Sequence, residues 1–95
     1  MKLMIFDKRN RNWQNEDYNL QFIHHTEMYL NDLIEARGYL YANEVYESLG
    51  LKWNPEWENE LYLYNEKYRP YVIQFEVFPK GDDGYLIQLL SNGKK

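Results

Sequence analysis

The sequence predicts an α+β domain of two layers, in which a helical hairpin packs on a three- to four-stranded, mainly antiparallel sheet. Three observations predict this fold. Apolar residues recur at three- and four-residue steps over residues 17–50, they alternate with other residues over 58–90, and turn-forming residues separate these segments. The 95 residues suffice for one hydrophobic core, so we expect a single domain over residues 1–95.

The N-terminal part, residues 1–16, opens with the apolar run MKLMIF, which favours a first strand, and continues as a polar loop. From about residue 17 the spacing of apolar residues is typical of an amphipathic helix. This helix is expected to end at Gly38, where a left-handed C-terminal cap would stand. Its polar face is expected to carry Glu27, Asn31, Asp32 and Glu35.

A second, short helix is expected next, within residues 17–50. Its apolar residues stand at i, i+3, i+4 and i+7, and Gly50 closes the segment. These apolar residues are Ala42, Val45, Tyr46 and Leu49. A helix of about eight residues is not stable alone, so it must pack on the first helix and on the sheet.

Residues 58–90 are expected to form a β-meander of three strands, because the apolar period changes to two. In its first strand Leu61 and Leu63 are predicted to face the helices, which leaves the tyrosines at 62 and 64 on the outer side. The turn at residues 79–84 is rich in Pro, Gly and Asp and suits a hairpin, and residues 91–95 are expected to be a tail. The later strands are expected to face the helices with Ile73, Phe75, Val77, Ile87 and Leu89.

The composition excludes several classes of protein. No cysteine is present, so disulfides and thiolate chemistry are excluded, and a reducing cytoplasm is the expected compartment. The apolar runs are too short to span a bilayer and the N-terminus lacks the apolar core of a secretory signal, so we expect no membrane association. The formal net charge of −4 disfavours non-specific binding to nucleic acid.

Neither a catalytic centre nor a cofactor site is predicted. His24 and His25 are adjacent, so they point about 100° apart on a helix and do not share a face on which to chelate a metal ion. The glycines form no phosphate-binding loop. We therefore expect no metal, no cofactor and no enzymatic activity. A small hydrolase built on His25 and the helix carboxylates is the enzymatic alternative.

A basic strip near the N-terminus points to a second function. It places three positive charges beside an aromatic ring that is able to stack on a base. The residues are Lys8, Arg9, Arg11 and Trp13. The alternative interpretation is a solubilising loop, since the rest of the chain is acidic.

Aromatic residues make up 18% of the chain, and they crowd one loop and the strand that follows it. An exposed aromatic cluster is typical of a surface that binds another protein or a second copy of the same chain. The predicted binding residues are Trp53, Trp57, Tyr62 and Tyr64. The alternative is that the tryptophans close the end of a small core and the tyrosines only stack across strands.

Two segments resemble a pattern in small uncharacterised proteins of phages, plasmids and conjugative elements of Gram-positive bacteria. They are YLNDLIEARGYL at residues 29–40 and NEVYESLGL at 43–51, followed by Trp53 and the Asp83-Gly84 turn. The resemblance implies a helix ending at Arg-Gly-Tyr, a short second helix, a tryptophan loop and a small sheet. It also implies a mobile genetic element as the setting, and it implies no activity and no catalytic residues.

The leading interpretation is therefore a non-enzymatic, cytoplasmic interaction module, whose partner is another protein or a homo-oligomeric copy. A nucleic-acid-binding accessory protein is the alternative.

Overall fold

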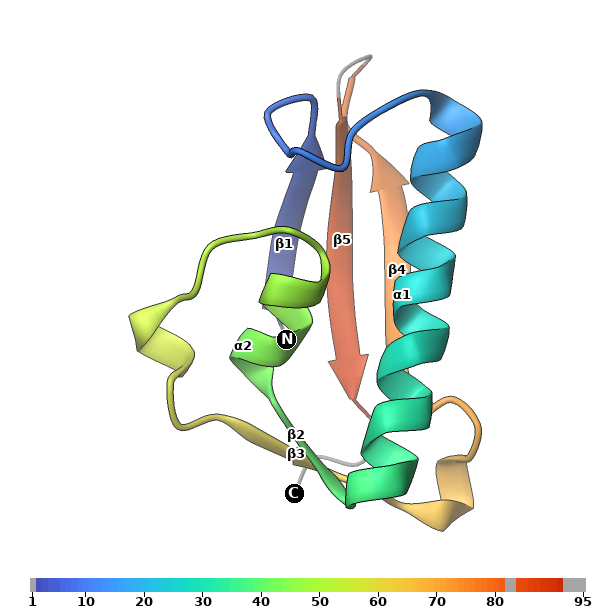
Figure 1. The fold of residues 1–95 in the computed structure, drawn as a ribbon, viewed down its shortest axis with the longest axis vertical. Helices are drawn as coiled ribbons and strands as arrows, with labels where there is room; N and C mark the ends of the chain where they lie inside the picture. Colours follow the sequence, from blue (N-terminus) through green and yellow to red (C-terminus); the bar gives the residue numbers. More distant parts are fainter. Residues whose placement is uncertain (1, 82–83, 92–95) are drawn as a thin grey trace.

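The computed structural model describes residues 2–81 and 84–91 and confirms the α+β class. The predicted turn residues Asp82 and Asp83 and most of the predicted tail lie outside the described residues. Two helices and two small antiparallel sheets make up the fold (Figure 1). The elements are β1 (Lys2–Asp7), α1 (Glu16–Arg37), β2 (Tyr39–Tyr41), α2 (Ala42–Ser48), β3 (Leu61–Leu63), β4 (Ile73–Pro79) and β5 (Gly84–Ser91), with 3-10 turns at Pro55–Trp57 and Glu66–Tyr68.

The larger sheet has three antiparallel strands in the order β1-β5-β4. The predicted first strand is confirmed, and it pairs with the last strand of the chain: Met4 lies opposite Ile87. On the other side of β5, Val77 of β4 lies opposite the same Ile87. Central β5 therefore joins the two ends of the sequence in one sheet.

The predicted three-stranded meander is wrong at its first strand. Only β4 and β5 form a hairpin, whereas β3 leaves the sheet and pairs with β2 in a separate two-stranded ribbon. Further backbone bonds extend this ribbon at both ends: Ala42 N donates to Glu60 O at 3.0 Å, and Tyr64 N donates to Gly38 O at 2.9 Å. Strand β2, which separates the two helices, supplies the partner that β3 was expected to find in β4.

The long helix α1 begins and ends at residues that satisfy its free backbone groups. Asn15 precedes it, and the side chain of this N-cap residue accepts a hydrogen bond from Tyr18 N at 2.9 Å. At the other end Gly38 adopts φ 89°, a left-handed conformation, and its N–H donates to Ile34 O at 2.7 Å. The predicted end of the helix is therefore confirmed.

The core lies between the helices and one face of the larger sheet, which both helices cover (Figure 1). The predicted inward faces of β4 and β5 are confirmed, because their odd-numbered apolar residues belong to the core or pack against it. The largest fully buried side chains are Phe6, Leu30, Ile34, Leu40, Leu49, Ile73, Ile87, Val45, Val72 and Asn19.

Two residues assigned to the polar face of α1 instead contact the sheet. The side-chain amide of Asn31 donates to Ile73 O and its carbonyl accepts from Ile73 N, both at 2.8 Å. One turn earlier, Glu27 accepts a hydrogen bond from Phe75 N at 2.7 Å. These side chains occupy the outer edge of β4, where an edge strand presents unpaired backbone groups. The assignment of Glu27 and Asn31 to a polar face away from the sheet is therefore corrected, because α1 also lies beside β4.

Candidate functional site: the face of the β2–β3 ribbon

The ribbon of β2 and β3 presents an apolar face to solvent. Its strands pair antiparallel, with Tyr39 opposite Leu63 and Tyr41 opposite Leu61. Because side chains alternate along a strand and directly opposed residues share a face, these four side chains lie on one side of the ribbon. All four are exposed. We call Tyr39, Tyr41, Leu61 and Leu63 the ribbon face.

The other side of the ribbon holds Leu40 opposite Tyr62, and both are buried. The prediction that Tyr62 faces outward and the leucines inward is therefore wrong: Tyr62 is only 3% exposed. Its register with Leu40, a core residue between the two helices, decides which face turns inward. Burial, reinforced by the charge of Glu60, raises the pKa of the Tyr62 phenol above its ordinary value.

The other predicted binding residues are divided between surface and core. Trp53 is exposed, as predicted. Trp57 is half-buried, because its ring packs edge-on against Tyr46 with centroids 4.8 Å apart and Lys2 Nζ lies 4.2 Å from its centre. Tyr64 is half-buried and packs against the core. The structure therefore does not bring Trp53, Trp57, Tyr62 and Tyr64 together as one exposed cluster.

An ion pair fixes the ribbon to both helices. Arg37, the last residue of α1, donates to both carboxylate oxygens of Glu44 in α2, at 2.7 and 2.8 Å. The same carboxylate accepts from Tyr41 N at 2.9 Å. Arg37 holds the pKa of Glu44 below its usual range. Arg37 and Glu44, which both lie in the two segments that resemble the known pattern, therefore connect α1, β2 and α2.

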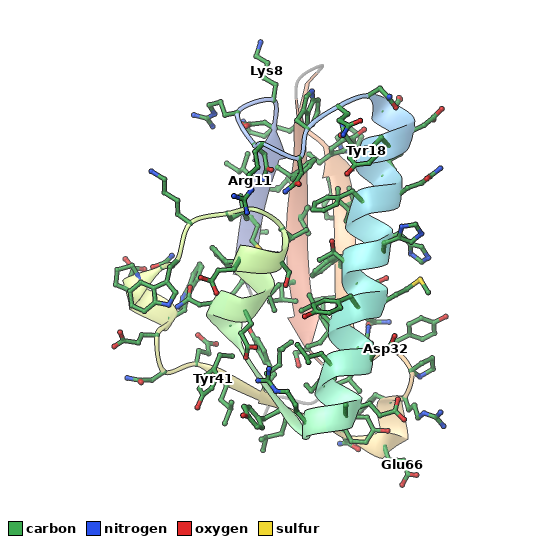
Figure 2. The ribbon with its side chains drawn as sticks, in the orientation of Figure 1. Lys8, Arg11, Tyr18, Asp32, Tyr41 and Glu66 are labelled. Atoms are coloured by element: carbon green, nitrogen blue, oxygen red, sulfur yellow. The ribbon has the colours of Figure 1, made fainter. Side chains whose placement is uncertain are left out.

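Aromatic rings make up half of the ribbon face. Tyr39 and Tyr41 meet edge-on with centroids 5.8 Å apart, and the Arg37 guanidinium lies 4.4 Å from the Tyr39 ring centre. Figure 2 shows Tyr41 pointing away from the body of the molecule. The face is therefore pre-ordered by its own contacts, and its rings project into solvent.

The sequence on both sides of β3 is acidic. Residues 53–68 contain four glutamates against one lysine. Of these, Glu60 accepts a hydrogen bond from Lys2, whereas Glu56, Glu58 and Glu66 are exposed. These three exposed glutamates flank β3 in the sequence, on both of its sides.

The predicted basic strip lies toward the end of the molecule opposite Tyr41, where Figure 2 labels Lys8 and Arg11. Arg9 is paired with Asp7 at 2.8 Å, which lowers the pKa of that carboxyl. Trp13 is half-buried, with its ring 5.7 Å from Phe6 and 5.9 Å from Tyr85, so part of this ring packs against the core. A shallow hollow of about 440 Å³ instead gathers Arg9 and Arg11 with Lys52, which the sequence analysis did not include.

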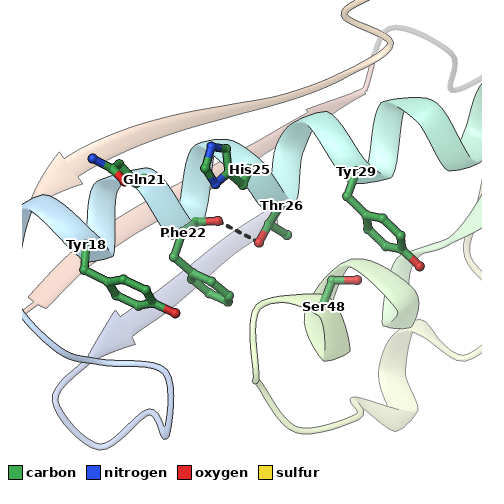
Figure 3. Close-up of a pocket in the computed structure, with 7 residues that line it drawn as sticks. All are labelled: Tyr18, Gln21, Phe22, His25, Thr26, Tyr29 and Ser48. Carbon is green, nitrogen blue, oxygen red and sulfur yellow. Dashed lines mark hydrogen bonds between the residues drawn. The ribbon is translucent and has the colours of Figure 1, made fainter.

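An open groove of about 600 Å³ separates α1 from α2 (Figure 3). His25 and Ser48 both line it, but Ser48 Oγ donates to Glu44 O at 2.7 Å, and Figure 3 shows His25 turned away from Ser48. The nearby His24 lies 3.8 Å from Glu27, at i,i+3 spacing. Across the described residues no three histidines or carboxylates are grouped to hold a metal ion. The groove assembles no acid–base pair.

Sequence reasoning missed a set of asparagines that hold the loops beside the ribbon. Asn43 of α2 exchanges two hydrogen bonds with the backbone of Asn54, at 2.9 and 2.7 Å. The side chain of Asn54 in turn accepts from Glu56 N at 2.9 Å and starts the turn that carries Trp57. Asn-Pro at 54–55 signals such a turn, but no local pattern connects it to Asn43.

These observations define a two-layer α+β domain that exposes an apolar face on a small ribbon. The family model of DUF6353, a family of unknown function, matches residues 2–78, and the chain belongs to this family. No curated protein and no solved structure matches the chain. Among the described residues, neither helix has the length and apolar character needed to cross a bilayer.

Proposed function

We propose that the protein is a non-enzymatic interaction module that binds a partner protein through the ribbon face. The observation that carries this proposal is the solvent exposure of all four of its side chains, two tyrosines and two leucines, on one pre-ordered surface. Aromatic side chains with few free torsions are the residues that most often anchor protein interfaces. The binding surface is still an aromatic strand surface, as the sequence predicts. It lies on the face of the ribbon opposite Tyr62, and not on the face that includes Tyr62 and Tyr64.

The residues in and near the ribbon face indicate which kind of partner it would bind. The exposed glutamates of residues 53–68 attract positive charge, and the leucines and tyrosines bury apolar side chains. The expected ligand is therefore an apolar segment of a partner protein that is flanked by lysine or arginine. Its binding should weaken as salt concentration rises, because the flanking charges are screened.

The proposal is tested with a library of random peptides displayed against the purified protein. We expect the selected peptides to carry lysine or arginine beside apolar residues. They should bind the Tyr41→Ser and Leu63→Ser variants at least about 10-fold more weakly than the wild type, the effect of losing an interface anchor.

Met28→Ser supplies the matched control, since Met28 is exposed on α1 and away from the ribbon. Circular dichroism of each variant separates loss of binding from loss of folding. Selected peptides that bind the ribbon variants as tightly as the wild type would contradict the proposal.

A nucleic-acid-binding accessory role is the second candidate. It is favoured by the hollow that gathers Arg9, Arg11 and Lys52 from two loops. Retention on single-stranded DNA or RNA that declines with salt, and that is lost in an Arg11→Ala, Lys52→Ala double variant, would support this role. Absence of retention at low salt would exclude it.

The genetic setting and the cellular compartment belong to the same proposal. The resemblance of residues 29–51 to proteins of phages and plasmids supports a mobile genetic element as the source, and the absence of cysteine suits the cytoplasm. Neighbouring genes for phage structure, replication or conjugation would support the first statement, and chromosomal housekeeping neighbours would contradict it.

A further inference from the structure

The larger sheet has an outer face, opposite the helices, that no element of the described ranges covers (Figure 1). Its residues are those that alternate with the buried positions of β1, β4 and β5. They are Leu3, Ile5, Gln74, Glu76, Phe78, Leu86, Gln88 and Leu90.

An apolar row crosses all three strands on this outer face. Leu86 of central β5 lies opposite Ile5 of β1 on one side and opposite Phe78 of β4 on the other. Ile5 is 42% exposed, Phe78 45%, and the adjoining Leu3 53%. The solvated face of an antiparallel sheet ordinarily carries polar residues, so this row is an exception that requires a reason.

The sequences of β1 and β5 also indicate that the outer face is covered by a partner. Residues 3–6 read LMIF and residues 85–90 read YLIQLL, so each strand is apolar on both of its faces. Continuous apolar runs of this kind are typical of strands that are covered on both sides. The helices cover one side of β1 and β5, and the second side lacks its cover within this chain's described elements.

We propose that two copies of the chain pack face to face through these outer faces, with the helices on the outside of the dimer. The charges on the face select a second copy as the occupant. Glu76 is the only acidic or basic residue among the eight, and it stands on edge strand β4. Asp7, at the end of β1, is already engaged by Arg9.

A face with a single carboxylate, placed on an edge strand, repels its own copy little and does not select a strongly charged partner. The central polar residue also suits a symmetric contact. Gln88 lies between Leu3 and Glu76 in the sheet register, and its amide both donates and accepts hydrogen bonds. It is therefore able to bond to the amide of a second copy, which two carboxylates at this position would not do. This inference is independent of the ribbon face, which lies in another sheet.

The size of the outer face sets the expected strength of the dimer. Three strands about 4.8 Å apart and about six residues long give a surface of roughly 14 by 20 Å. Two such surfaces with their rims remove on the order of 1,000 Å² from water, the low end for specific interfaces. The dimer should therefore be concentration-dependent rather than permanent.

Sedimentation velocity from about 10 μM to 1 mM tests the proposal across the affinities expected of such an area. We expect the average mass to rise from the 11.7 kDa of one chain toward twice that value. Ile5→Lys and Phe78→Lys should each abolish the rise, because each places a charge in the apolar row.

Met28→Lys on α1 is the matched control, since it adds the same charge at a similarly exposed apolar residue and should leave the dimer intact. Gln88→Glu is a milder variant that keeps the size of the side chain, and it should weaken the dimer at least about 10-fold through repulsion between the two faces. Circular dichroism establishes that each variant is folded.

Three results would overturn the proposal. A mass of one chain at every concentration would exclude the dimer. Loss of the dimer in Ile5→Lys with retention in Phe78→Lys would assign it to pairing of β1 edges, and loss only in Leu63→Lys would assign it to the ribbon face. Backbone amide shifts followed on dilution of the wild type give the same answer without a variant, because they should change in β1, β4 and β5 and not in β2 and β3.

Discussion

The two edges of the larger sheet are closed by different chemistry. On β4, the neutral amide of Asn31 forms two hydrogen bonds with the backbone of Ile73 and so takes the place of a neighbouring strand. On the β1 side, Lys2 extends its side chain to Glu60 and over the ring of Trp57. On the β4 side the backbone of Ile73 is itself bonded, whereas on the β1 side the contact with the neighbouring loop is made by the end of a charged side chain.

The two contacts differ in what they determine: the amide fixes a register, whereas the ion pair only holds two segments close together. A side-chain amide matches the donor and acceptor of a strand residue, so it fixes the register of α1 on β4 and leaves neither backbone group of Ile73 for another chain. An ion pair holds two segments together without using the backbone of the strand. The β4 edge should therefore be the more costly one to disturb, and the β1 edge should respond more to charge.

The largest expected effect is that of Asn31→Leu. It leaves the N–H and C=O of Ile73 buried without partners, and we expect the free energy of unfolding to fall by about 2–4 kcal/mol. Urea denaturation measures this loss. Asn31→Asp is the informative companion, because it keeps an acceptor for Ile73 N but loses the donor to Ile73 O.

Glu27→Gln is the control for the same edge, since an amide oxygen still accepts from Phe75 N. It should cost less than about 1 kcal/mol. A loss for Asn31→Leu no larger than that for Glu27→Gln would show that the amide does not close this edge.

The second effect is a loss of stability at alkaline pH on the β1 side. Burial, with the charges of Glu56 and Glu60, raises the pKa of Tyr46 from 10 to about 12. Below pH 10 the phenol is protonated in both states and has no effect. Between pH 10 and about 12 the unfolded chain loses the proton while the folded chain keeps it, so stability falls as pH rises.

We expect this loss to reach about 1–2 kcal/mol in the wild type and to shrink in Tyr46→Phe, which has no phenol to ionise. Denaturation midpoints measured at pH 9 and above, over about three pH units, give the comparison. Equal slopes for the two proteins would assign the alkaline loss to other groups.

Local patterns in the sequence predict the elements better than their pairing. The period of apolar residues and Gly38 predict α1 and its end, and alternation predicts β4 and β5, because each signal is contained within one element. Strand β3 has only three residues, so its partner and its buried face depend on Leu40, about twenty residues earlier. No local rule makes Tyr62 rather than Leu61 the core residue.

The hydrogen bonds by which Asn31 and Glu27 close the edge of β4 also cannot be predicted from the sequence. Asn31 follows the buried Leu30, and Glu27 stands four residues before Asn31. Both residues therefore lie close to the apolar stripe of α1. A polar side chain in that position belongs either to solvent or to a neighbouring backbone, and only the placement of β4 beside the helix decides between them. The ribbon face cannot be predicted either, because its two strands lie on either side of α2 in the sequence and only the fold brings them together.

The smallest effect is expected for Lys2→Met. This variant keeps a long apolar side chain at a buried position and removes the ammonium group that donates a hydrogen bond to Glu60. Because the side chain of Glu60 is still 22% exposed, water can solvate the carboxylate that Lys2 no longer bonds, so the free energy of unfolding should fall by only about 1 kcal/mol, and its dependence on salt should decrease. Urea denaturation at low and high salt measures both quantities. If Lys2→Met instead costs as much as Asn31→Leu, the ion pair closes the β1 edge as firmly as the amide closes β4, and the two edges are equivalent after all.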